Sequence, residues 1–179
     1  MKIAYISENA AVRNDNIYVN RDGEINDHIY LKEELNSRGI EIHTVDVYED
    51  LYEVDWFLFK NINVSWLKKL NRLGILNRAV YYSLEPPVVV KENDSVGYRK
   101  ISSFFGNILT WNDELVDNPR IFKTNIIRYF VKEFGNTQFD SKKLLVNISG
   151  NKTSKHKHEL YSERAKVIDW YEKNAIDDF

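Results

Sequence analysis

The sequence predicts an α/β fold in which a Rossmann-like parallel sheet is flanked by helices. Short apolar runs alternate with amphipathic segments about five times before the last third of the chain. Polar turns rich in Asn and Asp separate these segments, and Gly39 and Gly74 stand where helices should end. Alternating strands and helices indicate a parallel sheet with helices on both faces, whose ligands bind beyond the carboxyl ends of the strands.

The expected strands are the apolar and alternating runs. Ile40–Val47 alternates apolar and polar residues, which favours a half-buried strand, whereas the continuous run Trp56–Phe59 favours a fully buried one. In chain order the expected strands are 2–7, 40–47, 56–59, 78–82, 107–111 and 143–148.

The expected helices lie between these runs. Asp27 and Ser65 have side chains suited to cap the first two helices. In the third, Val96, Ile101 and Phe104 share one face and should be the buried side. The expected helices are 28–38, 65–73, 95–105 and 159–173, with a helical turn at 113–116.

Segment 117–140 shows no sustained period and carries Pro119 and Gly135, so we expect an extended connection there. The predicted organisation is an N-terminal lobe at 1–116, the connection at 117–140, and the start of a C-terminal lobe at 141–179. Because a single βα unit cannot bury both faces of a sheet, we expect this second lobe to be incomplete.

Composition excludes several classes of function. The net charge of −2 argues against nucleic-acid binding, which needs a basic excess. The chain has no cysteine, which excludes disulfides and thiolate chemistry and is compatible with a reducing cytoplasm. Without a run of about 18 apolar residues, no transmembrane segment is expected, so any membrane association would be peripheral. The oligomeric state is not predicted.

Glu85 is the first candidate for chemistry. It lies just after an expected strand and directly before Pro86 and Pro87. Proline fixes its own φ and pushes the preceding residue out of the helical region, so Glu85 should be held extended on a stiff loop. A carboxylate held there can act as a general base on an attacking hydroxyl. The alternative is that Glu85 pairs locally while the prolines turn the chain.

The loop at 149–158 is the second candidate. It offers Gly150, the side-chain amide of Asn151, hydroxyl groups, and the lysines Lys152, Lys155 and Lys157. A helix begins after it, and the positive end of that helix should face an anion in the loop. Such a loop suits a diphosphate leaving group. The alternative is a solvated loop whose lysines serve solubility.

Other features weigh less. His156 and His158 have no third ligand nearby in sequence, so no zinc site is expected, and no Asp-x-Asp pair that would hold a divalent metal occurs. Neither a P-loop nor a G-x-G-x-x-G motif is present. The aromatic pair Tyr81 and Tyr82 should be core. Trp111, at the end of an expected strand, is the candidate for stacking on an acceptor sugar, with core packing as the alternative.

Taken in order, these segments resemble glycosyltransferase family ten, the α-1,3/1,4-fucosyltransferases, in its bacterial branch. Leu84–Pro87 is similar to the family's glutamate-serine-proline type motif. Ile108–Asn112 resembles the segment that follows it. Asn151 matches the asparagine that follows the first strand of the second lobe, Lys157 stands where the family has an arginine, and Leu160–Tyr161 follow in register.

The resemblance implies two Rossmann-like lobes of the GT-B type and a metal-independent, inverting transfer of fucose from GDP-fucose to a saccharide hydroxyl, in glycan or lipopolysaccharide and capsule synthesis. By resemblance, Glu85 would be the base, and Asn151, Lys152 and Lys157 would face the donor diphosphate. A related sugar nucleotide is an open alternative as donor, and no cofactor is implied.

Family members continue past Phe179, so we expect weak or absent activity from these 179 residues alone. Two other classes stay open: a non-catalytic carbohydrate-binding or regulatory module, and an unrelated α/β nucleotide-binding protein.

Overall fold

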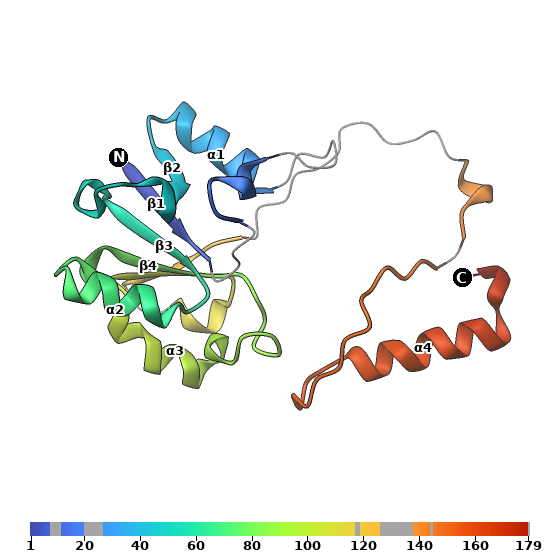
Figure 1. Cartoon of the computed structure of the whole chain (residues 1–179). Coiled ribbons are helices and arrows are strands. Elements are labelled where there is room, and N and C mark those ends of the chain that lie inside the picture. The colour runs from blue at the N-terminus through green and yellow to red at the C-terminus, as the bar shows by residue number, and fades with distance from the viewer. Residues whose placement is uncertain (8–11, 20–26, 117–118, 126–137, 144, 179) are drawn as a thin grey trace. The chain divides into compact units, whose positions relative to one another are not determined.

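The computed structural model describes residues 1–7, 12–19, 27–116, 119–125, 138–143 and 145–178. The chain divides into two compact units, Met1–Phe130 and Val131–Phe179 (Figure 1).

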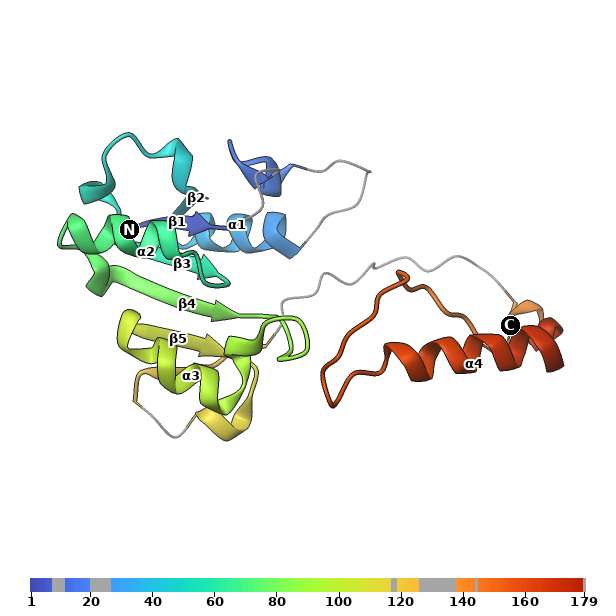
Figure 2. The ribbon, with the colours of Figure 1, turned by 60° about the horizontal axis from the view of Figure 1, so that its bottom comes forward.

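A sheet of six parallel strands forms the centre of the N-terminal unit. The strands are β1 (Lys2–Ile6), β2 (Glu41–Thr44), β3 (Trp56–Lys60), β4 (Ala79–Ser83), β5 (Asn107–Thr110) and β6 (Ile121–Lys123). Their order across the sheet is β2-β1-β3-β4-β5-β6, and every neighbouring pair is parallel (Figure 2). The predicted α/β fold with a parallel sheet is confirmed.

The direction in which the chain crosses the sheet reverses between β1 and β3. From β1 the chain moves outward to β2, then returns past β1 to β3 and continues through β4, β5 and β6. In such folds a ligand crevice lies beyond the carboxyl ends of the strands at this switch point. Lys60 ends β3 there, and Asn61 follows with a positive φ of 68°.

Helices cover both faces of the sheet (Figure 1). Helix α1 (Asp27–Ser37) lies on one face, and α2 (Val64–Arg72) and α3 (Ser95–Ile101) pack on the other. The predicted stops are confirmed, because Gly39 and Gly74 adopt φ values of 71° and 72°, which favour glycine.

The cap of α2 differs from the prediction. Asn63, rather than Ser65, is the capping residue: its Oδ1 accepts the backbone N–H of Trp66 at 3.1 Å. The Ser65 hydroxyl donates to the same oxygen at 2.7 Å and therefore supports the cap without forming it. Both residue types cap helices, and Ser65 lies inside α2, where its side chain cannot take the N-cap position.

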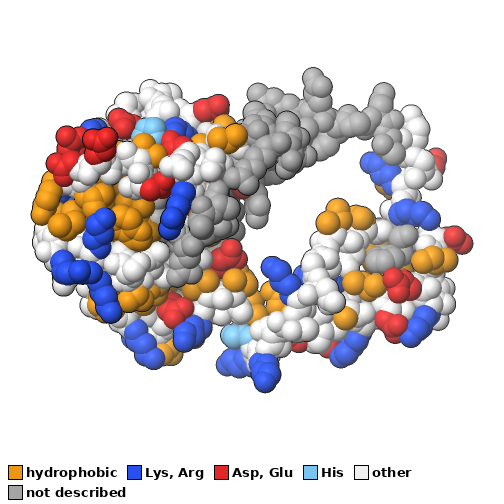
Figure 3. All heavy atoms as spheres, in the orientation of Figure 1, with side chains coloured by type: hydrophobic (Ala, Val, Ile, Leu, Met, Phe, Trp, Pro, Cys, Tyr) orange, Lys and Arg blue, Asp and Glu red, His pale blue; other side chains and the backbone are white. Residues whose placement is uncertain are grey.

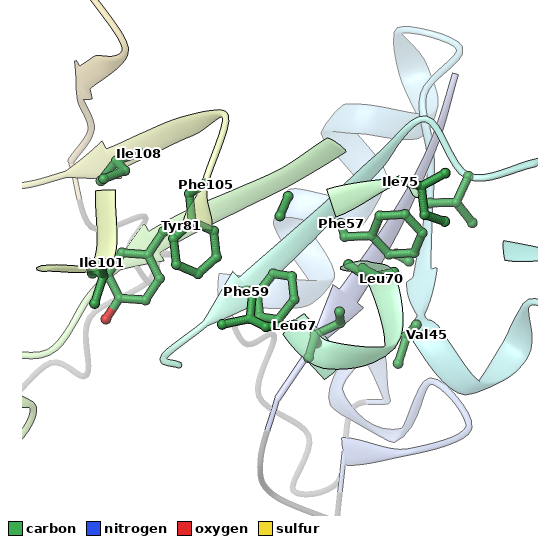
Figure 4. Close-up of a cluster of buried hydrophobic side chains, with 14 of the residues drawn as sticks. Val45, Phe57, Phe59, Leu67, Leu70, Ile75, Tyr81, Ile101, Phe105 and Ile108 are labelled. Atoms are coloured by element: carbon green, nitrogen blue, oxygen red, sulfur yellow. The ribbon is translucent and has the colours of Figure 1, made fainter. Parts of the chain in front are cut away.

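The hydrophobic core lies between the sheet and the α2–α3 layer (Figure 4). Phe57, Phe59 and Tyr81 are 0% exposed, and Leu70 of α2 packs in the same cluster. The ring centroids of Tyr81 and Phe105 are 5.1 Å apart. The prediction that the tyrosine pair belongs to the core is confirmed, since Tyr82 is also buried.

The α1 face of the sheet is less well covered. On β3, Phe57 and Phe59 are buried, whereas Trp56 and Leu58, which point to the α1 face, are half-buried. The prediction of a fully buried β3 is therefore wrong. The physical reason is that, among the described helices, only α1 packs on this face.

Helix α3 is shorter than predicted and faces differently. Its buried residues are Gly97, Tyr98 and Ile101, while Val96 and Phe104 are 50% and 48% exposed. A 3-10 turn at Ser102–Phe104 changes the rotation per residue and points Phe104 outward.

The predicted connection at 117–140 contains a strand. Ile121–Lys123 forms β6, held by hydrogen bonds of Ile108 N–H to the Arg120 carbonyl (2.9 Å) and of Thr124 N–H to the Thr110 carbonyl (2.8 Å). Residues 117–118 and 126–137 of the predicted connection lie outside the described residues.

The C-terminal unit contains one α-helix among its described residues, α4 (Tyr161–Asn174), and short 3-10 turns at Phe139–Ser141 and Ile176–Asp178. The predicted strand at 143–148 is absent from the described part of that segment, where Val146 and Ile148 are 78% and 94% exposed. A strand needs a paired neighbour, and the described residues of this unit supply none. In Figure 3, lysine and histidine side chains gather at the tip of its 149–158 loop.

Candidate functional site

The loop after β4 carries Glu85 and is held by a buried asparagine. The Asn93 side chain is 1% exposed, and its Nδ2 donates to the Glu85 carbonyl at 2.6 Å. The Asn93 Oδ1 in turn accepts the hydroxyl of Tyr81 at 2.8 Å. Tyr81 is a fully buried residue of β4, so this chain of hydrogen bonds ties the backbone of Glu85 to the core.

The same loop is also fixed to α3. The Asp94 carboxylate caps α3 by accepting the Gly97 N–H at 2.6 Å. A Cβ on Gly97 would lie 2.4 Å from the Cα of Glu92, so only glycine permits this close approach. The Pro86 carbonyl accepts two further backbone bonds, from the amides of Val89 and Val90. The loop is therefore held by hydrogen bonds and by its close packing on α3, in addition to the two prolines from which its stiffness was predicted.

The Glu85 carboxylate itself makes no hydrogen bond or ion pair with any residue that the structure describes, and the residue is half-buried. No local pairing of its side chain is seen within the described chain. Its backbone is fixed while its oxygens stay available to a ligand. That combination is what a general base requires.

Three buried hydroxyl groups lie at the carboxyl ends of β4 and β5, beneath this loop. Ser83 and Thr110 are register partners, 1% and 0% exposed, and the Tyr98 hydroxyl of α3 approaches both. Burial raises the pKa of Tyr98, and the two neighbouring hydroxyls offset part of that rise. The oxygens of Ser83 and Tyr98 make no well-aligned hydrogen bond within the described residues. Sequence reasoning did not select this cluster, although two of its members end strands.

Trp111 follows β5 at the same edge of the sheet, as predicted. The residue is half-buried, and its indole Nε1 is buried without a hydrogen-bond partner among the described residues. Its carbonyl accepts the Lys123 ammonium at 2.7 Å, and Lys123 also pairs with Asp113 at 2.5 Å. Because the N–H edge of the ring is buried, only the exposed part of the indole could stack on a sugar, and the burial of this edge agrees with the core-packing alternative.

A charged cluster at the ends of β1 and β2 was not predicted. Asp15, at a positive φ of 59°, accepts the Thr44 N–H at 2.7 Å and the Lys32 ammonium at 2.8 Å, and also contacts His43. Burial alone would raise the pKa of Asp15, but these hydrogen bonds outweigh it and lower the pKa. The cluster fastens segment 12–19 to β2 and is satisfied by its own members.

His28 lies at the start of α1 beside Tyr5, whose hydroxyl is 3.3 Å from its Nε2. Burial, reinforced by the nearby charge of Lys60, lowers the pKa of His28 and favours the neutral imidazole. His28 and His43 are both half-buried, and each contacts a polar side chain of the same unit.

The C-terminal unit contains a pocket of about 490 Å³ between the 149–154 loop and the first turns of α4. Of the residues predicted to face a diphosphate, Asn151 and Lys152 line this pocket, whereas Lys157 is not among its lining residues. Arg164 of α4 also lines the pocket and was not predicted. A guanidinium can bind phosphate oxygens bidentately. In the sequence, Arg164 could have been selected because it lies about one helical turn after Tyr161, near the start of the expected helix that follows the loop.

The N-terminus of α4 is not open to an anion, contrary to the prediction. The helix begins at Tyr161, and the Glu159 carboxylate accepts the backbone amides of Tyr161 (2.7 Å) and Ser162 (3.1 Å). The hydrogen bonds from Ser162 lower the pKa of Glu159, which is also a lining residue of the pocket. A bound phosphate must therefore rely on the loop, Lys152 and Arg164, or displace this carboxylate.

No protein-family model, curated protein or solved structure matches the chain. The resemblance to glycosyltransferase family ten accordingly stays a prediction from the motifs. Within the described residues, no helix has the length and apolar character needed to cross a membrane. The same residues bring together no group of three or more acidic or histidine side chains that could hold a metal ion.

Proposed function

We propose that the protein is a sugar-nucleotide-dependent glycosyltransferase of the fucosyltransferase type. Glu85 carries this proposal, because it combines an anchored backbone with a carboxylate that has no partner among the described residues. Acting as a general base, Glu85 takes the proton from an acceptor hydroxyl as that oxygen attacks the anomeric carbon of the donor sugar. The bond from this carbon to the diphosphate breaks, and the diphosphate leaves with the electron pair.

The pocket of the C-terminal unit supports the second half of the proposal. The leaving diphosphate gains negative charge, and cationic groups that meet this charge lower the barrier. Lys152 and Arg164 supply two cations, and Asn151 supplies an amide donor. We propose GDP-fucose as donor and a saccharide as acceptor on the strength of the motif resemblance, and no metal is required by the groups named.

The test is the release of GDP from GDP-fucose in the presence of a panel of free saccharides. We expect slow release by the 179-residue chain, and a loss of at least about a hundredfold in Glu85→Gln, since general-base catalysis contributes at least that much. Glu92→Gln, which removes a carboxylate from the same loop, should act like the parent chain. If the chain neither releases nor binds GDP, or if both variants behave alike, the proposal fails.

A non-catalytic nucleotide-binding module is the second candidate, and one observation favours it. All lining residues of the phosphate pocket belong to the C-terminal unit, so anion binding needs no residue of the Glu85 loop. That module would bind GDP and show no dependence of any activity on Glu85.

A further inference from the structure

The α1 face of the sheet carries an apolar groove of about 290 Å³. Its floor is formed by Trp56, Leu58, Val80 and Leu109, with Leu31 of α1 along one side. No charged side chain of the described chain lines it. The groove lies within the N-terminal unit and shares no lining residue with the Glu85 loop or with the pocket of the C-terminal unit.

This groove is an exception to the packing of the sheet. On the opposite face, Phe57, Ala79 and Tyr81 are 0% exposed, whereas Leu58 and Val80, beside them on the same strands, are only half-buried. Parallel sheets normally have both faces covered. An apolar groove at the centre of such a sheet indicates a site for an apolar ligand or partner.

The lining of the groove crosses the sheet from Ile3 of β1 to Leu109 of β5, and part of it follows β3 and β4 toward the edge that carries the Glu85 loop. This part extends from Trp56, the first residue of β3, past Leu58 and Val80, which are register partners. It then reaches Tyr82, which pairs with Lys60 near the carboxyl ends of β3 and β4. Glu85 lies on the loop that begins where β4 ends. A chain lying along the groove therefore presents its end at the edge from which this loop leaves.

The Tyr82 end of the groove is polar, and Lys60, the register partner of Tyr82, lies beside it without being one of its lining residues. Lys60 points to the same face as Leu58 and forms no ion pair with any described residue. Tyr82 and Thr124 interact through their side chains at this end, and the Asp27 carboxylate is close enough to act on the Tyr82 hydroxyl. The charge of Lys60 is complementary to an anionic group placed where the apolar floor ends.

We infer that the groove binds the hydrocarbon chain of a lipid-linked acceptor, in which the saccharide is joined to the lipid through phosphate. This inference rests on the proposed function and names its acceptor class. The hydrocarbon lies on Leu58, Val80 and Leu109, the phosphate lies at Lys60, and the saccharide extends beyond the sheet edge. Lipid anchoring would thereby raise the concentration of the acceptor hydroxyl at the edge that carries the Glu85 loop.

Binding of a series of alkyl phosphates, from ethyl to decyl, to the whole 179-residue chain tests this inference. Titration calorimetry is carried out below the micelle-forming concentration of each compound. Affinity should rise by about threefold to fourfold for each added methylene until the groove is filled, and then level off. An affinity that does not depend on chain length overturns the inference.

Matched variants locate the binding. Val80→Thr keeps the shape of the side chain and adds a hydroxyl to the floor, and should weaken decyl phosphate binding by about tenfold. Val64→Thr, at a 57% exposed position on α2, is the control and should have no effect. Lys60→Gln should weaken decyl phosphate binding and leave 1-decanol binding unchanged. Equal effects of the two valine variants, or no effect of Lys60→Gln, contradict the assignment.

Other occupants give different results. If a second copy of the chain covers the groove, sedimentation will show a dimer. Val80→Thr should dissociate this dimer, whereas decyl phosphate should not, and that result overturns the inference. Failure of the proposed function is separable, because alkyl phosphate binding requires no turnover. Suppose that alkyl phosphates bind in the groove but GDP release is the same in Glu85→Gln as in the parent chain. The lipid site would then stand, and the proposed transferase function would be contradicted.

Discussion

The two units of the chain hold their candidate sites by different means. In the N-terminal unit, the Glu85 backbone is tied through Asn93 to Tyr81 and so to a core of fully buried side chains. In the C-terminal unit, no described residue from 138 to 177 is buried, and the pocket is shaped by local hydrogen bonds such as those of Glu159. The first site is therefore as stable as a folded domain, whereas the second depends on one helix and its adjoining loop.

The largest difference in stability between the two units is expected when a buried core side chain is compared with an exposed one. Phe57→Ala removes a ring that is 0% exposed and should lower the free energy of unfolding by about 3–5 kcal/mol. Val167→Ala, at a 48% exposed position of α4, should cost no more than about 0.5 kcal/mol. Urea unfolding monitored by circular dichroism measures both changes. Similar losses would contradict the contrast between the units.

Two glycines provide the next comparison. Gly97→Ala places a Cβ 2.4 Å from Glu92 Cα and should cost about 1–3 kcal/mol and reduce turnover, because the Glu85 loop must shift. At Gly150, in the loop at 149–158, the nearest atom to an added Cβ is 3.9 Å away, so Gly150→Ala should leave stability unchanged. Thermal unfolding and GDP release measure the two effects. A tolerated Gly97→Ala would show that the loop is not held by α3.

The charge at the start of α4 gives a prediction for binding. Glu159→Gln keeps an oxygen for the amides of Tyr161 and Ser162 but removes a negative charge from the lining of the pocket. GDP affinity should therefore rise by a few-fold. Glu163→Gln is the matched control, since Glu163 is in the first turn and outside the pocket lining. A fall in GDP affinity in Glu159→Gln would mean that the carboxylate assists binding.

The smallest effect concerns pH. The pKa of His28 is lowered from its ordinary value of 6.5 by burial and by Lys60, so the unfolded chain takes up a proton before the folded one does. His28 therefore contributes stability that is present above pH 6.5 and is lost as the pH falls through the folded-state pKa. In His28→Gln the dependence of urea stability on pH below 6.5 should be shallower. An unchanged slope would assign that dependence to other groups.

The sequence pattern predicts those parts of the fold that rest on periodicity. β3 and β4 are visible as apolar runs because each places large side chains in the core. β6 has only three residues and is formed by pairing with β5, so no hydrophobic pattern in the sequence predicts it. The opposite error arose at 143–148, where an apolar run suggested a strand but no described neighbour pairs with it.

The candidate sites were predictable to different degrees. Glu85 could be selected because two prolines follow it, and Asn151 and Lys152 because they lie in a basic loop before a helix. Asn93 could not, since an asparagine in a polar turn carries no signal until its contacts with Tyr81 and Glu85 are known. The capping role of Glu159 likewise depends on where α4 begins, which a propensity pattern locates only to within about one turn.

Calorimetric titration of GDP into the purified chain tests the central claim most directly, with Lys152→Ala, Arg164→Ala and Lys157→Ala compared. If the pocket holds the donor diphosphate, the first two variants should each weaken GDP binding by about tenfold or more, as expected for lost charge-assisted hydrogen bonds. Lys157→Ala should bind as the parent chain does, because Lys157 is not a lining residue. Absence of GDP binding, or a loss confined to Lys157→Ala, would contradict the account.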